Sequence, residues 1–343
     1  MTGWAALLAD GRAARAELLA EVAEVRDLAG DRELRVRLAG GLAFDLRLDH
    51  GLDVGPAWWG STPLAWRSPN PVDPGPGASW EARFLGGLLA TCGPDNIGEP
   101  RKGVGQHGSH HHTPAHDVAW RREVVDGEVQ VVVTGRVTLS SLGGARVEVA
   151  RTVTARTGEA ALTVSDDVTN VGERAVGVPL LYHVNLGAPL LRPGSRLDVD
   201  AVRSTTREPL PFGRLPLLTP DVARAAVPVV AEHRDLATDD AATARATLLP
   251  PVGDGDGEGG GARVVVSWSA DTLPRLCTWS WPSAGAWVLG VEPANAPLFG
   301  RERTLPHAGA PVLEAGATWR TWVRIAVETP AGTGPGTDPG TDV

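Results

Sequence analysis

The chain of 343 residues has almost no lysine, little cysteine and no excess of positive charge. Lys102 is the only lysine, and the formal net charge is −9. A nucleic-acid-binding surface is normally basic, so this balance argues against a nucleic-acid partner. The two cysteines, Cys92 and Cys277, are too few for a disulfide framework in a chain of this length. We therefore expect a protein of the reducing cytoplasm.

Long apolar runs and common leader or phosphate-binding motifs are also missing. No window reaches the roughly 18 apolar residues of a membrane span. Residues 1–10 lack the basic start and the long apolar core of a secretory signal peptide. No GxGxxG or GxxxxGKS/T pattern stands between a strand and a helix. We therefore expect no membrane partner. We also expect the protein to be a monomer or a homodimer.

What the chain does contain is a series of short segments rich in Val and Thr, many of them alternating between apolar and polar residues. Turns rich in Gly, Asn and Asp separate them, as between the strands of hairpins. Strand-helix alternation is missing, which argues against Rossmann and TIM architectures. The pattern predicts a large antiparallel sandwich or barrel. The expected strands are residues 33–38, 42–48, 128–139, 145–154, 161–169, 263–268, 276–281, 286–297 and 319–327.

Three segments differ from this pattern, one near each end of the chain and one between two expected strands. Residues 12–28 are rich in helix formers, with apolar residues at helical spacing, and predict an amphipathic helix that packs on the main body. The acidic, glycine-rich residues 253–261 predict a hairpin tip. We expect an N-terminal helical segment (1–30), one β domain (31–328) and a disordered tail (329–343).

The segment 178–190 is the strongest candidate for a functional strand. It opens as an apolar run and then carries His183 and Asn185. In a strand these two residues point to the same face. Either the imidazole is satisfied by hydrogen bonds in the core, or both side chains face a binding site.

A second candidate is the strand that ends at Glu292. A carboxylate after Val288–Val291 is partly desolvated, which raises its pKa and suits it to act as a base. The alternative is a solvated glutamate at a strand end.

Residues 106–116 hold five of the nine histidines. A metal site, a sugar-binding loop and a solvated loop are all compatible with this cluster. No HExxH or CxxC spacing accompanies it, so a metal is the least favoured. Trp58, Trp59 and Trp66 either form the floor of a sugar site or cap the end of a sandwich.

Six motifs follow one another along the chain in a fixed order: GLD (51–53), GGLLATCG (86–93), HG (107–108), DDVTN (166–170), YHVNLG (182–187) and EP (292–293). They are similar to those of the aldose 1-epimerase (galactose mutarotase-like) superfamily, and above all to its aldose 1-epimerase-related branch. The resemblance spans roughly residues 33–327 and implies an all-β, galactose mutarotase-like antiparallel β-supersandwich with a short N-terminal helical segment. It also implies a sugar substrate and no cofactor.

The resemblance further implies that the enzyme interconverts sugar anomers, with His183 as general acid and Glu292 as general base. His107 would contact sugar hydroxyls. We expect the remaining substrate contacts to come from Asn185, Asp53, Asn96 and His112. Ser109 stands where relatives often carry Arg, so the sugar stays open. The alternatives are a metal-dependent sugar isomerase or lyase on the same fold, and a non-catalytic carbohydrate-binding protein.

Overall fold

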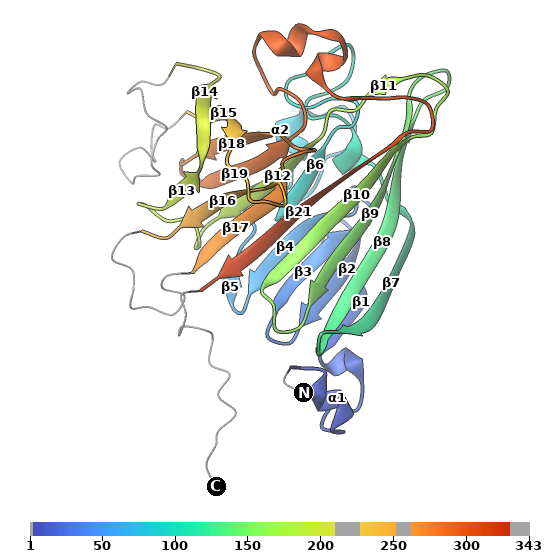
Figure 1. The fold of residues 1–343 in the computed structure, drawn as a ribbon, viewed down its shortest axis with the longest axis vertical. Coiled ribbons are helices and arrows are strands. Elements are labelled where there is room, and N and C mark those ends of the chain that lie inside the picture. The colour runs from blue at the N-terminus through green and yellow to red at the C-terminus, as the bar shows by residue number, and fades with distance from the viewer. Residues whose placement is uncertain (1–2, 210–226, 252–261, 330–343) are drawn as a thin grey trace.

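Two large antiparallel sheets form the body of the molecule (Figure 1), a computed structural model that describes residues 3–209, 227–251 and 262–329. Apolar side chains from both sheets meet in one main core, which contains Phe44 and Leu46 from the first sheet and Val133 and Val164 from the second. Sheets that bury one face each against the other form a β-sandwich. The expected all-β sandwich is confirmed.

The first sheet has eleven strands, of which β5 (Thr62–Pro63) pairs only with β4. The order of the others is β1 (Ala20–Arg26), β2 (Arg32–Leu38), β3 (Leu42–Arg47), β4 (Asp53–Trp59), β6 (Leu89–Cys92), β12 (Leu181–Gly187), β19 (Val288–Ala294), β18 (Arg275–Trp281), β15 (Val229–Leu236) and β14 (Ala201–Thr206).

The second sheet has eight strands, and a two-stranded sheet pairs β11 (Val176–Gly177) with β20 (Val312–Leu313). The order of the eight strands is β13 (Arg196–Val199), β16 (Thr243–Leu249), β17 (Arg263–Ser269), β21 (Thr318–Glu328), β10 (Ala161–Asn170), β9 (Arg146–Arg156), β8 (Glu128–Ser140) and β7 (His116–Val125).

Helices are short in the described part of the chain, and none of them is long and apolar enough to cross a membrane. They are α1 (Ala6–Ala9), η1 (Ala16–Leu18), α2 (Trp80–Arg83), η2 (His110–His112), η4 (Arg301–Thr304) and η5 (Pro306–Gly309).

The helix predicted over residues 12–28 is wrong. From Ala20 to Arg26 the chain forms β1, an edge strand that pairs with β2 in a register that sets Val22 opposite Val36. Leu28, the last residue of the expected helix, is 92% exposed and does not pack on the main body. Pairing with the neighbouring strand outweighs the helix propensity of these residues. The first sheet therefore begins at Ala20, before the expected boundary at residue 30.

The other expected strands are found, with ends shifted by a few residues at most places. The expected strand 286–297 is shortened at both ends to β19, because residues 282–287 before it form a loop and turn and residues 295–296 after it form a bend. The expected hairpin tip at 253–261 lies outside the described residues, as does the expected tail from residue 330 on.

A buried ionic network joins the two sheets behind the central strands. Arg151 on β9 binds Asp166 on β10 (Nη2 to Oδ2, 2.7 Å) and Asp53 on β4 (Nη1 to Oδ1, 2.6 Å). Tyr182 on β12 donates to Asp166, and Arg151 also donates to Thr91 on β6. Burial lowers the pKa of Arg151, but the two carboxylates outweigh it and the net pKa is raised. The network holds β6 and β12 in place.

Candidate active site

Strand pairing brings His183 and Glu292 together. On β12 and β19, Val184 pairs with Val291 and Asn185 with Gly290, so His183 lies opposite Glu292. Residues directly opposite one another in an antiparallel pair project to the same face of the sheet. These residues are more than a hundred positions apart in the sequence, yet rigid neighbouring strands hold them.

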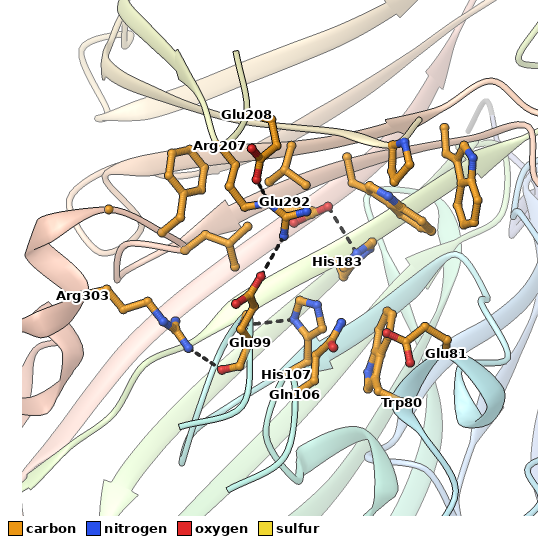
Figure 2. Close-up of a pocket in the computed structure, with 18 residues that line it drawn as sticks. Trp80, Glu81, Glu99, Gln106, His107, His183, Arg207, Glu208, Glu292 and Arg303 are labelled. Atoms are coloured by element: carbon orange, nitrogen blue, oxygen red, sulfur yellow. Dashed lines mark hydrogen bonds and ion pairs between the residues drawn. The ribbon is translucent and has the colours of Figure 1, made fainter. Parts of the chain in front are cut away.

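The two side chains form a close, buried pair. His183 Nε2 lies 3.2 Å from Glu292 Oε1, and the side chains are 3% and 2% exposed. Figure 2 shows the two groups pointing toward one another. Their alignment does not make a hydrogen bond, and Glu292 Oε1 and His183 Nδ1 lack a hydrogen-bond partner within the described residues. Buried polar atoms normally have hydrogen-bond partners, so two unsatisfied atoms in one buried pair are unusual for a purely structural role.

Burial shifts the pKa values of the pair in opposite directions. It lowers the pKa of His183 to about 4, against a smaller raising effect of the Asn185 side chain. It raises the pKa of Glu292 to about 8. Both groups resist charge in a dry environment. Between these values the pair holds one proton, and it therefore contains one proton donor and one proton acceptor.

Gly290 makes room for the pair. A Cβ at this position would collide with Glu292 Oε1 and would lie 3.1 Å from His183 Cε1. Gly290 precedes Glu292 by two residues and faces the same side of β19. The absence of a side chain at Gly290 thus allows His183 and Glu292 to approach one another.

The pair opens into a cavity of about 660 Å³. Aromatic side chains on α2 and β18 form part of its walls, and loops that carry Glu99, Arg207 and Glu208 form its rim. A concave site with apolar walls and a few polar groups at its centre is typical of small-ligand sites.

His107 is a third titratable side chain in this cavity, beside His183 and Glu292. Its ring centroid lies 5.9 Å from that of His183. Its Nδ1 accepts a hydrogen bond from the Gly98 N–H (3.3 Å), so the Nε2 carries the proton in the neutral ring. Burial holds the pKa of His107 well below its ordinary value. His107 is therefore a neutral hydrogen-bond donor.

Three tryptophans line the cavity that the sequence interpretation did not assign to it. Trp80 stacks on Phe84 (ring centroids 4.4 Å apart) and lies 4.6 Å from His107. Trp279 stands edge-on to His183 at 5.6 Å, and Trp281 follows it on the same face of β18. Trp279 and Trp281 are two positions apart on an expected strand and so share one face of it, which was the available signal in the sequence.

Gln106 is a further lining residue that the sequence interpretation missed. Its position directly before His107 was the only signal.

Several predicted contacts lie outside the cavity. Asn185 is fully buried, and its amide donates to the backbone oxygens of Gly87 and His183. The carboxylate of Asp53 accepts from both Thr91 N and Thr91 Oγ1 and belongs to the Arg151 network. Neither side chain lines the cavity with His183.

Asn96 and His112 are also set apart from it. The Asn96 amide donates to the backbone oxygens of Glu99 and Gly105, which shapes the loop before His107. His112 Nδ1 lies 3.6 Å from Asp73 Oδ2, and neither residue lines the cavity. Trp66 lies behind the wall, where it contacts Phe84 and Trp279, and its indole N–H donates to Ala286 O.

The histidines of residues 106–116 do not converge on a metal ion. His110 Nε2 lies 3.1 Å from Gly51 O, and His111 accepts from Trp80. One group in the described ranges, His50, Asp73 and His112, has ligand atoms close enough to share a cation. Arg83 already binds Asp73 through two nitrogens, and a cation would compete with that charge. This donor set does not fit a metal site well, and it lies outside the cavity.

Comparisons with solved structures agree with this architecture. A protein from Klebsiella pneumoniae subsp. pneumoniae, described as a candidate aldose 1-epimerase, superposes with a TM-score of 0.76 at 18% identity, over 89% of this chain and 81% of its own. A galactose mutarotase-like protein from Clostridium acetobutylicum gives 0.63 at 13% identity, over 91% and 99%. A galactose mutarotase related enzyme from Lactobacillus acidophilus gives 0.58 at 13%, over 87% and 97%.

At these identities the likeness shows the fold, which is the galactose mutarotase-like β-sandwich expected from the six motifs. No curated protein matches the chain in sequence. The model of the Domain of unknown function (DUF4432) matches residues 29–327, nearly the whole sandwich. The chain belongs to this family.

Proposed function

We propose that this protein is an aldose 1-epimerase-like enzyme that interconverts sugar anomers by general acid/base catalysis. The observation that carries the proposal is the buried pair of His183 and Glu292, 3.2 Å apart at the floor of a cavity. Anomer exchange needs one group that takes a proton and one that gives a proton. A pair that holds a single proton between pH 4 and 8 supplies both.

The reaction proceeds by ring opening. In the resting site the single proton is on Glu292, because its pKa is about 8 and that of His183 is about 4. Transfer of this proton to His183 gives the reactive form, in which the Glu292 carboxylate takes the proton of the anomeric hydroxyl and the His183 imidazolium donates a proton to the ring oxygen. The bond between the anomeric carbon and the ring oxygen breaks, which leaves an aldehyde. Rotation about the neighbouring carbon–carbon bond and reversal of the two proton transfers give the other anomer. Protons and electrons balance, and no cofactor takes part.

The surrounding side chains favour a bound sugar. The indole planes of Trp80, Trp279 and Trp281 offer flat apolar surfaces to the faces of a pyranose. The His107 N–H and the Gln106 amide offer hydrogen bonds to hydroxyl groups. Rigid placement of the reacting groups lowers the entropic cost of the reaction.

We favour a cytoplasmic enzyme that acts on a small-molecule sugar. Cys92 and Cys277 are free and buried, which is compatible with a reducing compartment. A metal-dependent isomerase or lyase is less well supported, because the one candidate group of metal ligands found among the described residues lies outside the cavity, and its Asp73 is bound to Arg83.

Anomer exchange measured by NMR magnetisation transfer tests the proposal. The panel contains aldoses, deoxy sugars and uronic acids, and the protein is treated with a chelator. We expect exchange above the spontaneous rate for at least one sugar. His183→Ala and Glu292→Gln should each reduce kcat by about a hundredfold or more, while the circular dichroism spectrum stays unchanged.

Two results would count against the proposal. Full activity in either variant would exclude the assigned acid/base pair. Binding of sugars without exchange would favour the non-catalytic carbohydrate-binding protein.

A further inference from the structure

An arginine with no acidic partner lines the cavity. Arg303 donates to the backbone oxygens of Ile97 and Glu99 and to Asn96 Oδ1 (3.0 Å), all of which are neutral acceptors. No carboxylate lies within ion-pair distance of its guanidinium in the described part of the chain. Burial lowers the pKa of Arg303, and the charge of the nearby Glu99 offsets only part of this effect.

A second guanidinium lies beside it. Arg101 donates to Leu305 O (3.4 Å), and its charge further lowers the pKa of Arg303. Arg101 reaches from the first loop to residue 305, and Arg303 reaches from the second loop back to residues 96–99. Neutral side chains could make such bonds to carbonyl oxygens, so these bonds alone do not require two positive charges. The exposed neighbours Lys102 and Arg301 add positive charge to the same loops of a chain whose net charge is −9.

Acidic groups near this edge of the cavity are already engaged. Glu99 and Glu208 on the rim are 70% and 77% exposed, and both lie within ion-pair distance of Arg207. Glu302 binds Arg234 and Arg275. Glu81 is exposed, and Figure 2 shows it on the far side of the cavity from Arg303, next to Trp80. Of the two arginines that line the cavity in the described structure, Arg303 is therefore the one without a carboxylate at ion-pair distance.

Arg303 is close enough to His107 to lower its pKa, and His107 lies 5.9 Å from His183. The cavity thus runs from the His183–Glu292 pair past His107 to Arg303. A sugar whose anomeric carbon is at the pair would extend its other end toward the guanidinium.

We propose that the substrate is an aldose that carries an anionic group, a carboxylate or a phosphate, at the end remote from the anomeric carbon, and that Arg303 binds this group. Charge-assisted hydrogen bonds between guanidinium and such anions are stronger than neutral ones. The Nε–H and one Nη1–H of Arg303 have no partner in the described structure and are free to make them. This inference rests on the proposed function, because it takes the position of the anomeric carbon from it.

Binding measured without turnover tests the inference separately from the reaction. Tryptophan fluorescence reports the dissociation constants of a hexose, the hexuronate of the same configuration and the hexose 6-phosphate. For the natural chain we expect one of the two anionic sugars to bind about tenfold or more tightly than the hexose. The two anionic sugars distinguish a carboxylate site from a phosphate site.

The variant Arg303→Gln keeps one amide for the loop carbonyls and should remove most of this preference, with the hexose affinity changed about twofold at most. Arg320→Gln removes one exposed positive charge from the second sheet and is the control, with the preference retained. If Arg303→Gln does not fold, Arg101→Gln should reduce the preference in the same direction. The preference should also weaken as ionic strength rises.

Equal binding of neutral and anionic sugars, or a preference that survives Arg303→Gln, would overturn the inference. Anionic preference that is lost in Arg303→Gln but comes without anomer exchange would support anion binding by Arg303 and overturn the proposed function. Exchange confined to neutral sugars would do the reverse. No binding of any of the three sugars would overturn both.

Discussion

The indole Nε1 of Trp80 donates a hydrogen bond to Nε2 of His111, at 3.2 Å. This bond joins α2 to η2 and fixes the indole that stacks on Phe84 and lies against His107. His111 accepts with Nε2, so its proton is on Nδ1 and the ring is neutral. Burial, which holds the pKa of His111 well below its ordinary value, favours the same state. The histidine-rich segment thus supports an aromatic wall of the cavity.

Replacing His111 by Leu should therefore weaken sugar binding more than it slows the chemical step. The indole N–H loses its acceptor, which should lower the free energy of unfolding by about 1–3 kcal/mol and let Trp80 reorient. We expect KM to rise about three- to tenfold with a smaller change in kcat. Steady-state kinetics and urea denaturation measure the two effects. His116→Leu, at an exposed position, is the control. An unchanged KM would mean that His111 supports the fold alone.

The glycine at position 290 should be essential for activity and dispensable for folding. A methyl group there collides with Glu292 Oε1 and crowds His183 Cε1 and Trp279 Cβ. We expect Gly290→Ala to push the carboxylate away from His183 and to reduce kcat by about tenfold or more, as small misplacements of reacting groups do. Anomer exchange at saturating sugar measures it. Gly105→Ala, where a Cβ meets open space, adds the same methyl as a control. Full activity of Gly290→Ala would show that the pair tolerates displacement.

Asp53 should affect stability and not sugar binding. Its two oxygens accept from Thr91 and Arg151, and the group is buried. Asp53→Asn places an amide N–H against donors, and breaking one partner of a buried ion pair costs about 3–5 kcal/mol. Urea denaturation should detect this loss, while the sugar dissociation constant of the folded fraction changes little. Arg320→Gln, which breaks an exposed pair, should cost less than about 1 kcal/mol. A loss of sugar affinity without a loss of stability would mean that Asp53 contacts the sugar, as the sequence motif suggested.

Much of the fold follows from local pattern, and less of the site does. Alternating Val and Thr segments specify strands of the second sheet such as β8 and β10, because one face of each is buried. The failure at β1 has a physical cause. Its residues favour a helix in isolation, and they become extended because their backbone pairs with the outer edge of β2. Pairing across the sheet is not encoded locally.

The same distinction applies to the cavity. His183 and Glu292 were predicted as partners from motif order, and the strand register sets them side by side. Asn185 and Asp53 stand in similar motifs, but their hydrogen bonds run to the backbone and to a buried arginine. Trp279 and Arg303 line the cavity through tertiary packing and were not predicted. Motifs identify polar residues that matter, and only the packed structure separates those that bind ligand from those that hold the fold.

The buried pair should also determine how stability varies above neutral pH. Glu292 has a pKa of about 8 in the folded protein and an ordinary value of 4.5, so between these values the folded state keeps a proton that the unfolded state has lost. Rising pH then lowers the free energy of unfolding by at most about 1.4 kcal/mol per pH unit. His183 acts in the opposite sense between pH 4 and 6.5, where the unfolded state binds the extra proton. The two effects cancel between pH 4.5 and 6.5, and above 6.5 the loss due to Glu292 remains.

We therefore expect this pair to lower stability by up to about 2 kcal/mol between pH 6.5 and 8, and Glu292→Gln to abolish that part of the decrease. Urea denaturation of both proteins across this range gives the difference directly, because contributions from all other groups are common to the two curves. Glu99→Gln removes an exposed carboxylate and should leave the pH dependence almost unchanged. Parallel curves for the natural chain and Glu292→Gln would mean that Glu292 is already ionised at neutral pH. The folded pair would then hold no proton at neutral pH that His183 could donate to the ring oxygen.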